Sequence, residues 1–302
     1  MTSPDPPAPD RAAEGTVGLS AATTVVGVIG DPVAHSLSPL LHNTAFAVLG
    51  LDWVSVGFRV RAGQTTAALV GARALGVRGL SVTMPHKDQV ARLVPLLSPT
   101  AERLGAVNCL VEAGTGAGVG EGDAWRGENT DGAGLLAALR HRDGFEPGGR
   151  RCLVVGAGGA GRAVVAALAD AGAAEVIVVN RTPERAAAAV ALAGAVGRAG
   201  GPDDAPSCDL VVNATPVGMD ATPAGDSGAS WPIDPSLLHA GQHVVDLIYH
   251  PSETPWMAAA RSKGATVDNG LGMLVHQAAL QLVAWTGLEP PLGAMWAAVH
   301  GR

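Results

Sequence analysis

The sequence predicts an α/β fold of two domains, in which short apolar strands alternate with amphipathic helices. The chain has 302 residues, of which 47% are hydrophobic and only 16% charged, enough apolar material for two ordinary cores. A polar stretch at 143–150, DGFEPGGR, separates two series of strands and helices. We expect each series to form a sheet, and the second to be parallel with right-handed crossovers.

The first series contains three expected strands and three expected helices. Short runs rich in Val, Ile and Leu predict the strands, and Ala- and Leu-rich amphipathic stretches predict the helices. The strands are expected at 25–30, 54–60 and 80–84, and the helices at 39–49, 64–75 and 86–97. A turn-rich stretch at 113–127 follows, and GENTDGAG then begins a helix at about residue 132.

The second series follows the polar stretch and has a repeated β-α-β order. Strands are expected at 152–156, 176–180, 210–215, 243–249 and 265–269, with helices that begin at 160 and 184. The last apolar stretch, LGMLVHQAALQLVAWTG, predicts a helix of nearly five turns, at about 3.6 residues per turn.

Composition argues against several classes of protein. The formal net charge is −7, so the chain lacks the basic field that holds a nucleic-acid backbone. No apolar run approaches the roughly 20 residues of a membrane span. Residues 1–22 are rich in Pro, Ala, Ser and Asp without the pattern of a signal peptide, so we expect a disordered tail there.

The cysteines indicate the compartment. Cys109, Cys152 and Cys208 are far apart, and none belongs to a C-x-x-C pair. An odd number of widely spaced thiols suggests neither a disulfide framework nor a zinc site, so no metal is expected. We therefore expect a reducing compartment, the cytoplasm.

A glycine-rich loop opens the second series. In RCLVVGAGGAGRAVVAAL, the pattern Gly156-x-Gly158-x-x-Gly161 comes directly after an expected strand and begins an expected helix. The glycines permit a tight turn and close backbone approach, and the helix N-terminus receives a pyrophosphate. This context predicts a dinucleotide-binding loop.

The end of the next strand indicates which dinucleotide is bound. An NAD enzyme usually presents a carboxylate to the ribose here, but VIVVNRTPER places Asn180, Arg181 and Arg185. Guanidinium groups match a 2′-phosphate, whereas a carboxylate would repel it. The sequence thus predicts NADP, with surface arginines beside a helix as the alternative.

The stretch GDPVAHSLSPLLHN places two hydroxyls at a helix start. Ser38 is expected to be the N-cap, with Pro39 as the first helical residue. The free amides and the hydroxyls of Ser36 and Ser38 would form a small anion site that suits a carboxylate. The alternative is that Ser38 only caps and Ser36 only turns the chain.

LSVTMPHKDQV places Thr83 at a strand end and Lys87 near a helix start. The helix dipole disfavours a cation there, and of the 20 lysines and arginines only Lys87 and Lys263 are lysines. An ammonium can release a proton and a guanidinium cannot, so Lys87 is a candidate proton donor. An ordinary surface lysine is the alternative.

Amides and a carboxylate occur at two further turns. GENTDGAG offers Asn129, Thr130 and Asp131 at a helix start, and GAVNCL places Asn108 in a strand after a turn. Helix capping and turn formation explain these residues as well as a functional role does.

Together these stretches resemble the shikimate dehydrogenase family, over residues 25–300. The motifs that carry the resemblance occur in the family's order: GDPVAHSLSPLLHN, SVTMPHK, GAVNCL, GENTDGAG, GAGGAGRA, NRTPERA, NATPVGM, DLIYHPSETP and NGLGMLVHQAA. Two residues depart from the pattern, because Ser81 stands where the family often has Asn and Cys109 where it often has Thr. Neither change removes a group on which the family's mechanism depends.

The resemblance implies how the chain divides into domains. A substrate-binding domain at 23–130 would be completed by C-terminal helices at 271–302, and a Rossmann-type NADP-binding domain would occupy 131–270. The site would lie in the cleft between them, so Gln277 could reach the substrate from beyond the second sheet.

Roles for individual residues also follow from the resemblance. Lys87 and Asp131 would be the catalytic pair, and Ser36 and Ser38 would bind the shikimate carboxylate, with Tyr249 nearby. The residues expected to meet the ring hydroxyls are Thr83, Lys87, Asn108, Asp131 and Gln277. The NADP-binding residues would be Gly156, Ala157, Gly158, Gly159, Ala160, Asn180, Arg181, Thr182 and Arg185, with Thr215, Leu247, Gly270 and Met273 beside the nicotinamide.

The implied reaction is the reversible, NADPH-dependent reduction of 3-dehydroshikimate to shikimate, a step towards chorismate and the aromatic amino acids. A quinate or aminoshikimate dehydrogenase of the same family is an alternative. A second alternative, from another class, is a non-catalytic NADP-binding sensor built on the same fold. We expect a monomer or homodimer, with no nucleic-acid or membrane partner.

Overall fold

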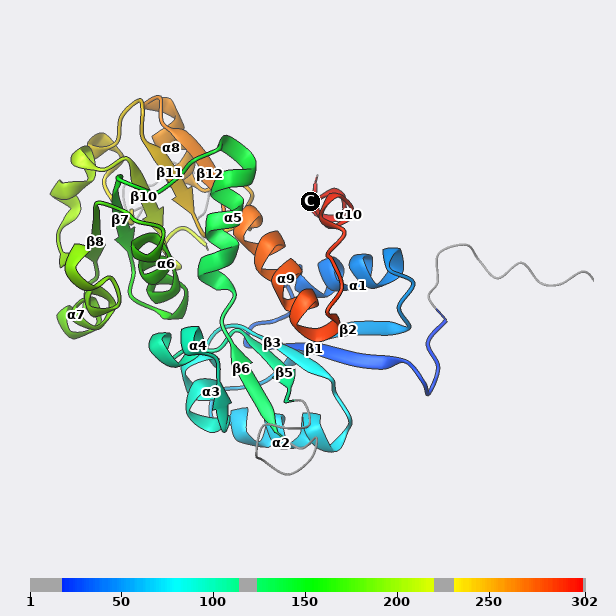
Figure 1. Cartoon of the computed structure of the whole chain (residues 1–302). Coiled ribbons are helices and arrows are strands. Elements are labelled where there is room, and N and C mark those ends of the chain that lie inside the picture. Colours follow the sequence, from blue (N-terminus) through cyan, green and yellow to red (C-terminus); the bar gives the residue numbers. More distant parts are fainter. Residues whose placement is uncertain (1–17, 114–123, 220–230, 301–302) are drawn as a thin grey trace, which may run out of the picture.

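The computed structural model describes residues 18–113, 124–219 and 231–300 and forms two lobes, each built around a six-stranded sheet (Figure 1). Most of the tail expected at 1–22 lies outside the described residues. The α/β fold class is confirmed, with a first sheet of mixed direction and a second that is entirely parallel.

The first sheet has the strand order β2-β1-β3-β5-β6-β4. Its strands are β1 (Thr24–Gly30), β2 (Trp53–Arg59), β3 (Gly79–Val82), β4 (Leu96–Leu97), β5 (Cys109–Glu112) and β6 (Trp125–Glu128). Strands β1, β2 and β3 are parallel, and β5 runs antiparallel to both β3 and β6. Helices α1 (Ser38–Val48), α2 (Thr65–Ala74), α3 (Lys87–Leu93) and α4 (Pro99–Leu104) belong to this half of the chain.

The second sheet has the strand order β12-β11-β10-β7-β8-β9. Its strands are β7 (Arg151–Val155), β8 (Glu175–Val179), β9 (Gly197–Ala199), β10 (Leu210–Asn213), β11 (His243–Asp246) and β12 (Thr266–Asn269). Between them lie α6 (Gly159–Asp170), α7 (Pro183–Leu192), α8 (Pro255–Ser262) and the 3₁₀ turns Gly194–Val196, Pro202–Ser207 and Pro235–Leu237. The order reverses at β7, so the switch point where such sheets bind ligands lies between β7 and β10.

Two long helices lie side by side between the lobes, and Figure 1 shows them in green and orange. Helix α5 (Asp131–Asp143) packs against both α6 and α9 (Leu271–Thr286). Helix α9 returns the chain to the first sheet, where it packs with α1 and the last helix, α10 (Leu292–Val299). Gly134 permits the close crossing of α5 and α9, because a Cβ there would lie 2.8 Å from Gln277 Cβ.

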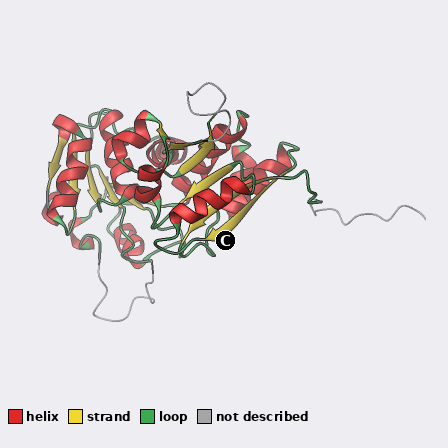
Figure 2. Cartoon of the chain, turned by 90° about the horizontal axis from the view of Figure 1, so that it is seen from below, coloured by secondary structure: helices red, strands yellow, loops and turns green. Residues whose placement is uncertain are grey.

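Helices pack around the sheets (Figure 2), and buried apolar side chains form clusters between the sheets and the helices. On the first sheet, a cluster that includes Phe46, Leu282 and Met295 fills the face covered by α1, α9 and α10. The opposite face packs against α2 and α3 through Leu69 and Val90. Parallel strands covered on both faces become continuous apolar runs, which is why five of the six strands of the second sheet were recognisable in the sequence. The edge strand β9, three residues with no fully buried position, was not expected.

The structure corrects three expectations about the first half. The helix expected at 86–97 ends at Leu93, because Val94 is extended, and a second helix begins after Ser98, whose Oγ accepts a hydrogen bond from Ala101 N–H at 3.2 Å. Asn108 is not in a strand but directly precedes β5. The stretch expected to be all turn contains β6, while residues 114–123 lie outside the described part.

The three cysteines are free and buried. Burial raises the pKa of the Cys208 thiol to about 11 and that of Cys152 to about 12, so the unreactive thiol form dominates at neutral pH. Within the described residues, no group of three or more His, Cys, Asp or Glu is arranged to hold a metal ion. None of the helices in the same residues combines the length and hydrophobicity that a membrane crossing requires.

Candidate active site

The dinucleotide loop follows β7 and meets the end of β10. Gly156 has φ +107°, which favours glycine, and a Cβ there would lie 2.9 Å from Ala214 O. A Cβ at Gly161 would collide with Gly156 O, so the helix start and the loop touch backbone to backbone. The three glycines therefore form the tight turn that the motif predicted, at the switch point of the sheet.

Asn180 connects this loop to the next strand. Its Oδ1 accepts the Ala157 N–H at 3.2 Å, and its Nδ2 donates to Thr182 O at 2.9 Å. Arg181 and Arg185 are exposed, and no hydrogen bond or ion pair joins either guanidinium to another residue in the described part of the chain. Both arginines are thus available to a phosphate ligand at the end of β8.

The residues expected beside the nicotinamide lie around the ends of β10, β11 and β12. Thr215 Oγ1 donates to Asn213 Oδ1 at 2.7 Å, and Gly270 N–H donates to Ile248 O at 3.1 Å. Met273 is only 8% exposed and belongs to the apolar core of the second lobe. Leu247 is half-buried and packs against this core.

Asp246 holds the loop that carries Leu247 and Tyr249. Its carboxylate accepts hydrogen bonds from Asn213 Nδ2 (3.0 Å), Ile248 N–H (3.1 Å) and Thr254 Oγ1 (2.8 Å). The side chain is fully buried, and burial raises its pKa to about 6, against the opposing effect of these hydrogen bonds.

Asp246→Asn is expected to change how stability depends on pH. Because the folded-state pKa of about 6 exceeds the unfolded value of about 3.9, this group's contribution is complete below about pH 4 and is lost as the pH rises through 6. Urea unfolding measures the free energy of unfolding of wild type and of Asp246→Asn at each pH. The difference, wild type minus variant, should fall by roughly 2–3 kcal/mol over that window, because one pKa unit corresponds to about 1.4 kcal/mol. The exposed Asp203→Asn is the control, and parallel pH profiles of wild type and Asp246→Asn would contradict the prediction.

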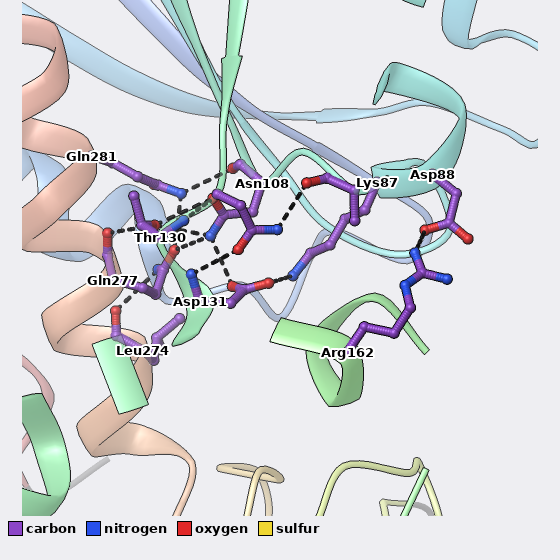
Figure 3. Close-up of polar contacts among 11 residues, drawn as sticks. Lys87, Asp88, Asn108, Thr130, Asp131, Arg162, Leu274, Gln277 and Gln281 are labelled. Carbon is purple, nitrogen blue, oxygen red and sulfur yellow. Dashed lines mark hydrogen bonds and ion pairs between the residues drawn. The ribbon is translucent and has the colours of Figure 1, made fainter. Parts of the chain in front are cut away.

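Lys87 and Asp131 form an ion pair where the two lobes meet. Lys87 is the first residue of α3 and Asp131 the first of α5, and Lys87 Nζ lies 2.5 Å from Asp131 Oδ2 (Figure 3). Their side chains are only 16% and 5% exposed. The helix dipole favours the carboxylate at the start of α5, and this carboxylate in turn holds the ammonium at the start of α3.

Asn108 fixes the other oxygen of Asp131. Its Nδ2 donates to Asp131 Oδ1 at 2.8 Å, and its Oδ1 accepts the Thr130 N–H at 2.8 Å. The Asp131 N–H itself donates to Asn129 Oδ1 at 3.1 Å. The turn before α5 is therefore held by two amide side chains, and the carboxylate is aimed at Lys87 (Figure 3).

Two glutamines from α9 complete the polar cluster. Gln277 Oε1 lies 3.3 Å from Asn108 Nδ2 and accepts from Gln281 Nε2 at 2.9 Å. Gln281 Nε2 also donates to Asn108 O at 3.0 Å. Gln277 thus reaches the starts of β5 and α5 from helix α9.

The structure corrects one expectation about the anion site predicted at the start of α1. Leu37, not Ser38, is the N-cap of α1, because Leu37 O accepts the first hydrogen bond of the helix, from Leu41 N–H at 3.1 Å. Ser38 is the first helical residue, and its N–H donates to Ser36 Oγ at 3.3 Å. Neither hydroxyl donates a hydrogen bond within the described residues, so both remain available to an anion.

Thr83 and Tyr249 lie next to this motif. Thr83 directly follows β3, and a Cβ on Gly30 would collide with its methyl group. Tyr249 comes from the second lobe; burial raises the pKa of its hydroxyl, and a hydrogen bond with the Leu37 backbone opposes this. The structure therefore places Tyr249 beside Leu37 at the start of α1, and Thr83 against Gly30 at the other end of the same stretch.

Sequence reasoning did not single out three residues of this region: Gln281, Asp88 and Arg162. Gln281 had a readable signal, since it lies four residues after Gln277, on the same face of an otherwise apolar helix. Asp88 and Arg162 gave no comparable signal, because a charge in the first turn of a helix is usually explained by solvent exposure.

Known proteins resemble the chain in every part of this site. A family model described as shikimate dehydrogenase substrate binding domain matches residues 28–110. Models described as shikimate / quinate 5-dehydrogenase and as shikimate 5'-dehydrogenase C-terminal domain match 141–199 and 270–300. Together they match part of each lobe and the returning helices, while Asp131, Thr215 and Tyr249 lie outside the three matched ranges.

Whole-chain similarities agree. The NADP(+) shikimate dehydrogenase of Moorella thermoacetica is 43% identical over 289 residues, which cover 92% of this chain and 93% of that protein. A shikimate dehydrogenase solved in complex with NADP+ is 35% identical, with a TM-score of 0.83 over 94% of this chain and 98% of that one. The Thermus thermophilus shikimate 5-dehydrogenase, solved with NADP(H) and shikimate, is 38% identical, with a TM-score of 0.80 over 91% and 98% of the chains.

Proposed function

The chain belongs to the shikimate dehydrogenase family, and we propose that Lys87 and Asp131 are the pair that moves the proton in its reaction. That reaction is the NADP-dependent interconversion of 3-dehydroshikimate and shikimate. The observation that carries the proposal is the 2.5 Å contact between Lys87 Nζ and Asp131 Oδ2, whose side chains are only 16% and 5% exposed. A non-catalytic sensor would have no use for this buried, hydrogen-bonded pair.

The residues present fit NADP. A Cβ on Gly158 would meet nothing within 4 Å, so the backbone at this point of the loop, directly before α6, is open to a pyrophosphate. Arg181 and Arg185, which have no partner within the described residues, suit the 2′-phosphate. When bound, NADPH supplies the hydride that reduces the ring ketone.

Lys87 is proposed as the proton donor to the ketone oxygen and, in the reverse direction, the acceptor from the hydroxyl. Asp131 orients the ammonium and accepts a hydrogen bond from the neighbouring ring hydroxyl. General acid catalysis of this kind typically contributes about 10²–10⁴ in rate. Replacing Lys87 by Arg tests the assignment, because arginine keeps the charge and holds its proton.

The remaining polar groups are proposed to bind and orient the ring. Ser36 and Ser38 donate to the substrate carboxylate, with Tyr249 beside them. Thr83, Asn108 and Gln277 meet the ring hydroxyls. These contacts supply positioning rather than chemistry, since they fix the ketone carbon between the nicotinamide side and Lys87.

Ser36→Ala and Ser38→Ala are each expected to raise the KM for shikimate, with a smaller change in the KM for NADP+. The reason is that the carboxylate contact belongs to the substrate alone. Steady-state assays at the NADPH absorbance band measure both constants, with Ser262→Ala on the remote helix α8 as the control.

Two further substrates make this test decisive. Equal reaction of shikimate and its methyl ester in wild type would show that no carboxylate site exists. Quinate carries the same carboxylate and an extra hydroxyl, so the ratio of kcat/KM for shikimate to that for quinate separates a shikimate enzyme from a quinate enzyme. A cytoplasmic location, a monomeric or homodimeric state, and domain boundaries at 130/131 and 270/271 stay predictions from the sequence.

A further inference from the structure

Two ion pairs join the first half of the chain to helix α6, one at each end of the helix. At the N-terminal end, Arg162 Nη2 lies 2.6 Å from Asp88 Oδ1. At the C-terminal end, Arg103 Nη1 contacts both oxygens of Asp170, at 2.9 and 3.0 Å. Between them, α4 and α6 pack through buried apolar side chains, which include Leu104 and Ala163. Along α6, the two lobes are therefore in direct contact.

The N-terminal pair lies directly beside the proposed proton donor. Asp88 follows Lys87 in the chain, and these two consecutive residues contact different elements, Arg162 of α6 and Asp131 of α5 (Figure 3). A Cβ on Gly159 would lie 3.3 Å from Lys87 Cδ and 3.8 Å from Asp88 Oδ1. The dinucleotide loop is thus in contact with the stem of Lys87.

Arg162 is placed where a cation needs a partner. It lies in the first turn of α6, where the helix dipole disfavours positive charge, and its side chain is only 19% exposed. Its Nε is buried without a hydrogen-bond partner in the part of the chain that the structure describes. Within those residues its ion-pair partner is Asp88, so this contact compensates for most of the burial of the charge.

We infer that Asp88 and Arg162 are positioning residues, whose ion pair holds the start of α3, and with it Lys87, against the dinucleotide loop. The inference rests on the proposed role of Lys87 in proton transfer. Proton and hydride must reach the two ends of one carbon–oxygen bond, so the ammonium and the dinucleotide loop need a fixed separation. A misplacement of about 1 Å can lower a rate by roughly 10².

A double-mutant cycle tests the pair. Asp88→Asn and Arg162→Gln are each expected to lower kcat roughly tenfold, with the KM values for shikimate and NADP+ changed much less. The double variant should be no slower than the slower single variant, because either change already removes the contact. Arg162→Lys keeps a charge that can reach Asp88, so it should retain more activity than Arg162→Gln.

The control is the ion pair at the other end of α6. Asp170→Asn removes the partner of Arg103, a contact that also joins the two halves but lies far from Lys87 along α6. Its kcat should stay near that of wild type. Thermal unfolding of all variants shows whether any loss of rate reflects loss of fold.

A second readout does not depend on activity. Lys87 and Lys263 are the only lysines of the chain, and Lys263 is an exposed residue directly after α8. Acetylation by acetic anhydride, followed by mass spectrometry, gives the reactivity of Lys87 relative to Lys263 in one sample. Loss of the pair should raise this ratio severalfold in Asp88→Asn and Arg162→Gln, and leave it unchanged in Asp170→Asn.

Three results would overturn the inference. Normal kcat and normal Lys87 acetylation in both single variants would show that the pair does not position Lys87. A raised KM for NADP+ in Arg162→Gln, with Asp88→Asn unaffected, would make Arg162 a direct phosphate contact through its spare donors. Failure of the proposed function gives a different result, since Lys87→Arg would then keep its kcat whatever the cycle shows.

Discussion

Lys87→Arg is expected to lower kcat by roughly 10² or more, with a far smaller loss of affinity for shikimate. Arginine keeps the positive charge beside Asp131, so an electrostatic role alone would survive the change. A guanidinium has a pKa above about 12 and is a very poor proton donor near neutrality. The variant therefore distinguishes two roles of Lys87, binding of a substrate hydroxyl by its charge and transfer of the proton.

Measurement of kcat and KM across the pH range tests this expectation. The pH profile of kcat for shikimate oxidation should differ between wild type and variant. Lys263→Arg is the matched control, because it makes the same chemical change at the other lysine, which is exposed. A near-normal kcat with the wild-type pH profile would remove Lys87 from the chemistry and leave Asp131 or a bound water as the proton carrier.

Arg181→Ala is expected to weaken NADP+ binding by about 1.5–3 kcal/mol, the usual range for hydrogen bonds to charged groups. This corresponds to roughly a 10- to 150-fold rise in Kd, at about 1.4 kcal/mol per tenfold. NAD+ lacks the 2′-phosphate, so its binding should hardly change. Because the Arg181 side chain is exposed and has no partner within the described residues, its loss should not disturb the fold.

Calorimetric titration of both nucleotides into wild type and variant provides the measurement. Arg261→Ala is the control, because Arg261 is half-exposed on α8 and pairs with Glu253, away from the end of β8. An equal loss of affinity for NADP+ and NAD+ would contradict the assignment of Arg181 to the 2′-phosphate.

The parts of the fold that local sequence determines were predictable. Strands β7 and β8 are apolar runs buried on both faces, so the sequence predicts them. The spacing of the glycines after β7 predicts the dinucleotide loop. Helix α4 and strand β6 were missed, because six and four residues carry too little periodic signal. The start of α1 was misplaced by one residue, since the backbone angles of Leu37 decide it and a serine before proline does not.

The candidate site was predictable as a set of residues but not as an arrangement. Residue chemistry alone singled out Lys87 and named Asp131 at a helix start, and the family resemblance added Gln277. The structure connects the three through Asn108 and Asp131. What the sequence could not supply is the contact between residues far apart in the chain, such as Gln281 with Asn108, separated by 173 positions. Such pairings depend on how α5 and α9 cross, and close packing at Gly134 decides that crossing.

The return of α9 and α10 to the first sheet has a consequence for the order in which a ribosome makes the protein. Phe46 and Leu41 emerge early, yet the cluster that buries them includes Val275, Leu282 and Met295, near the end of the chain. The first sheet therefore lacks this covering layer until α9 and α10 have been made, and both follow residues 151–269, which contain every strand of the second sheet. Domains generally fold as units during synthesis, so the half begun first is the half completed last.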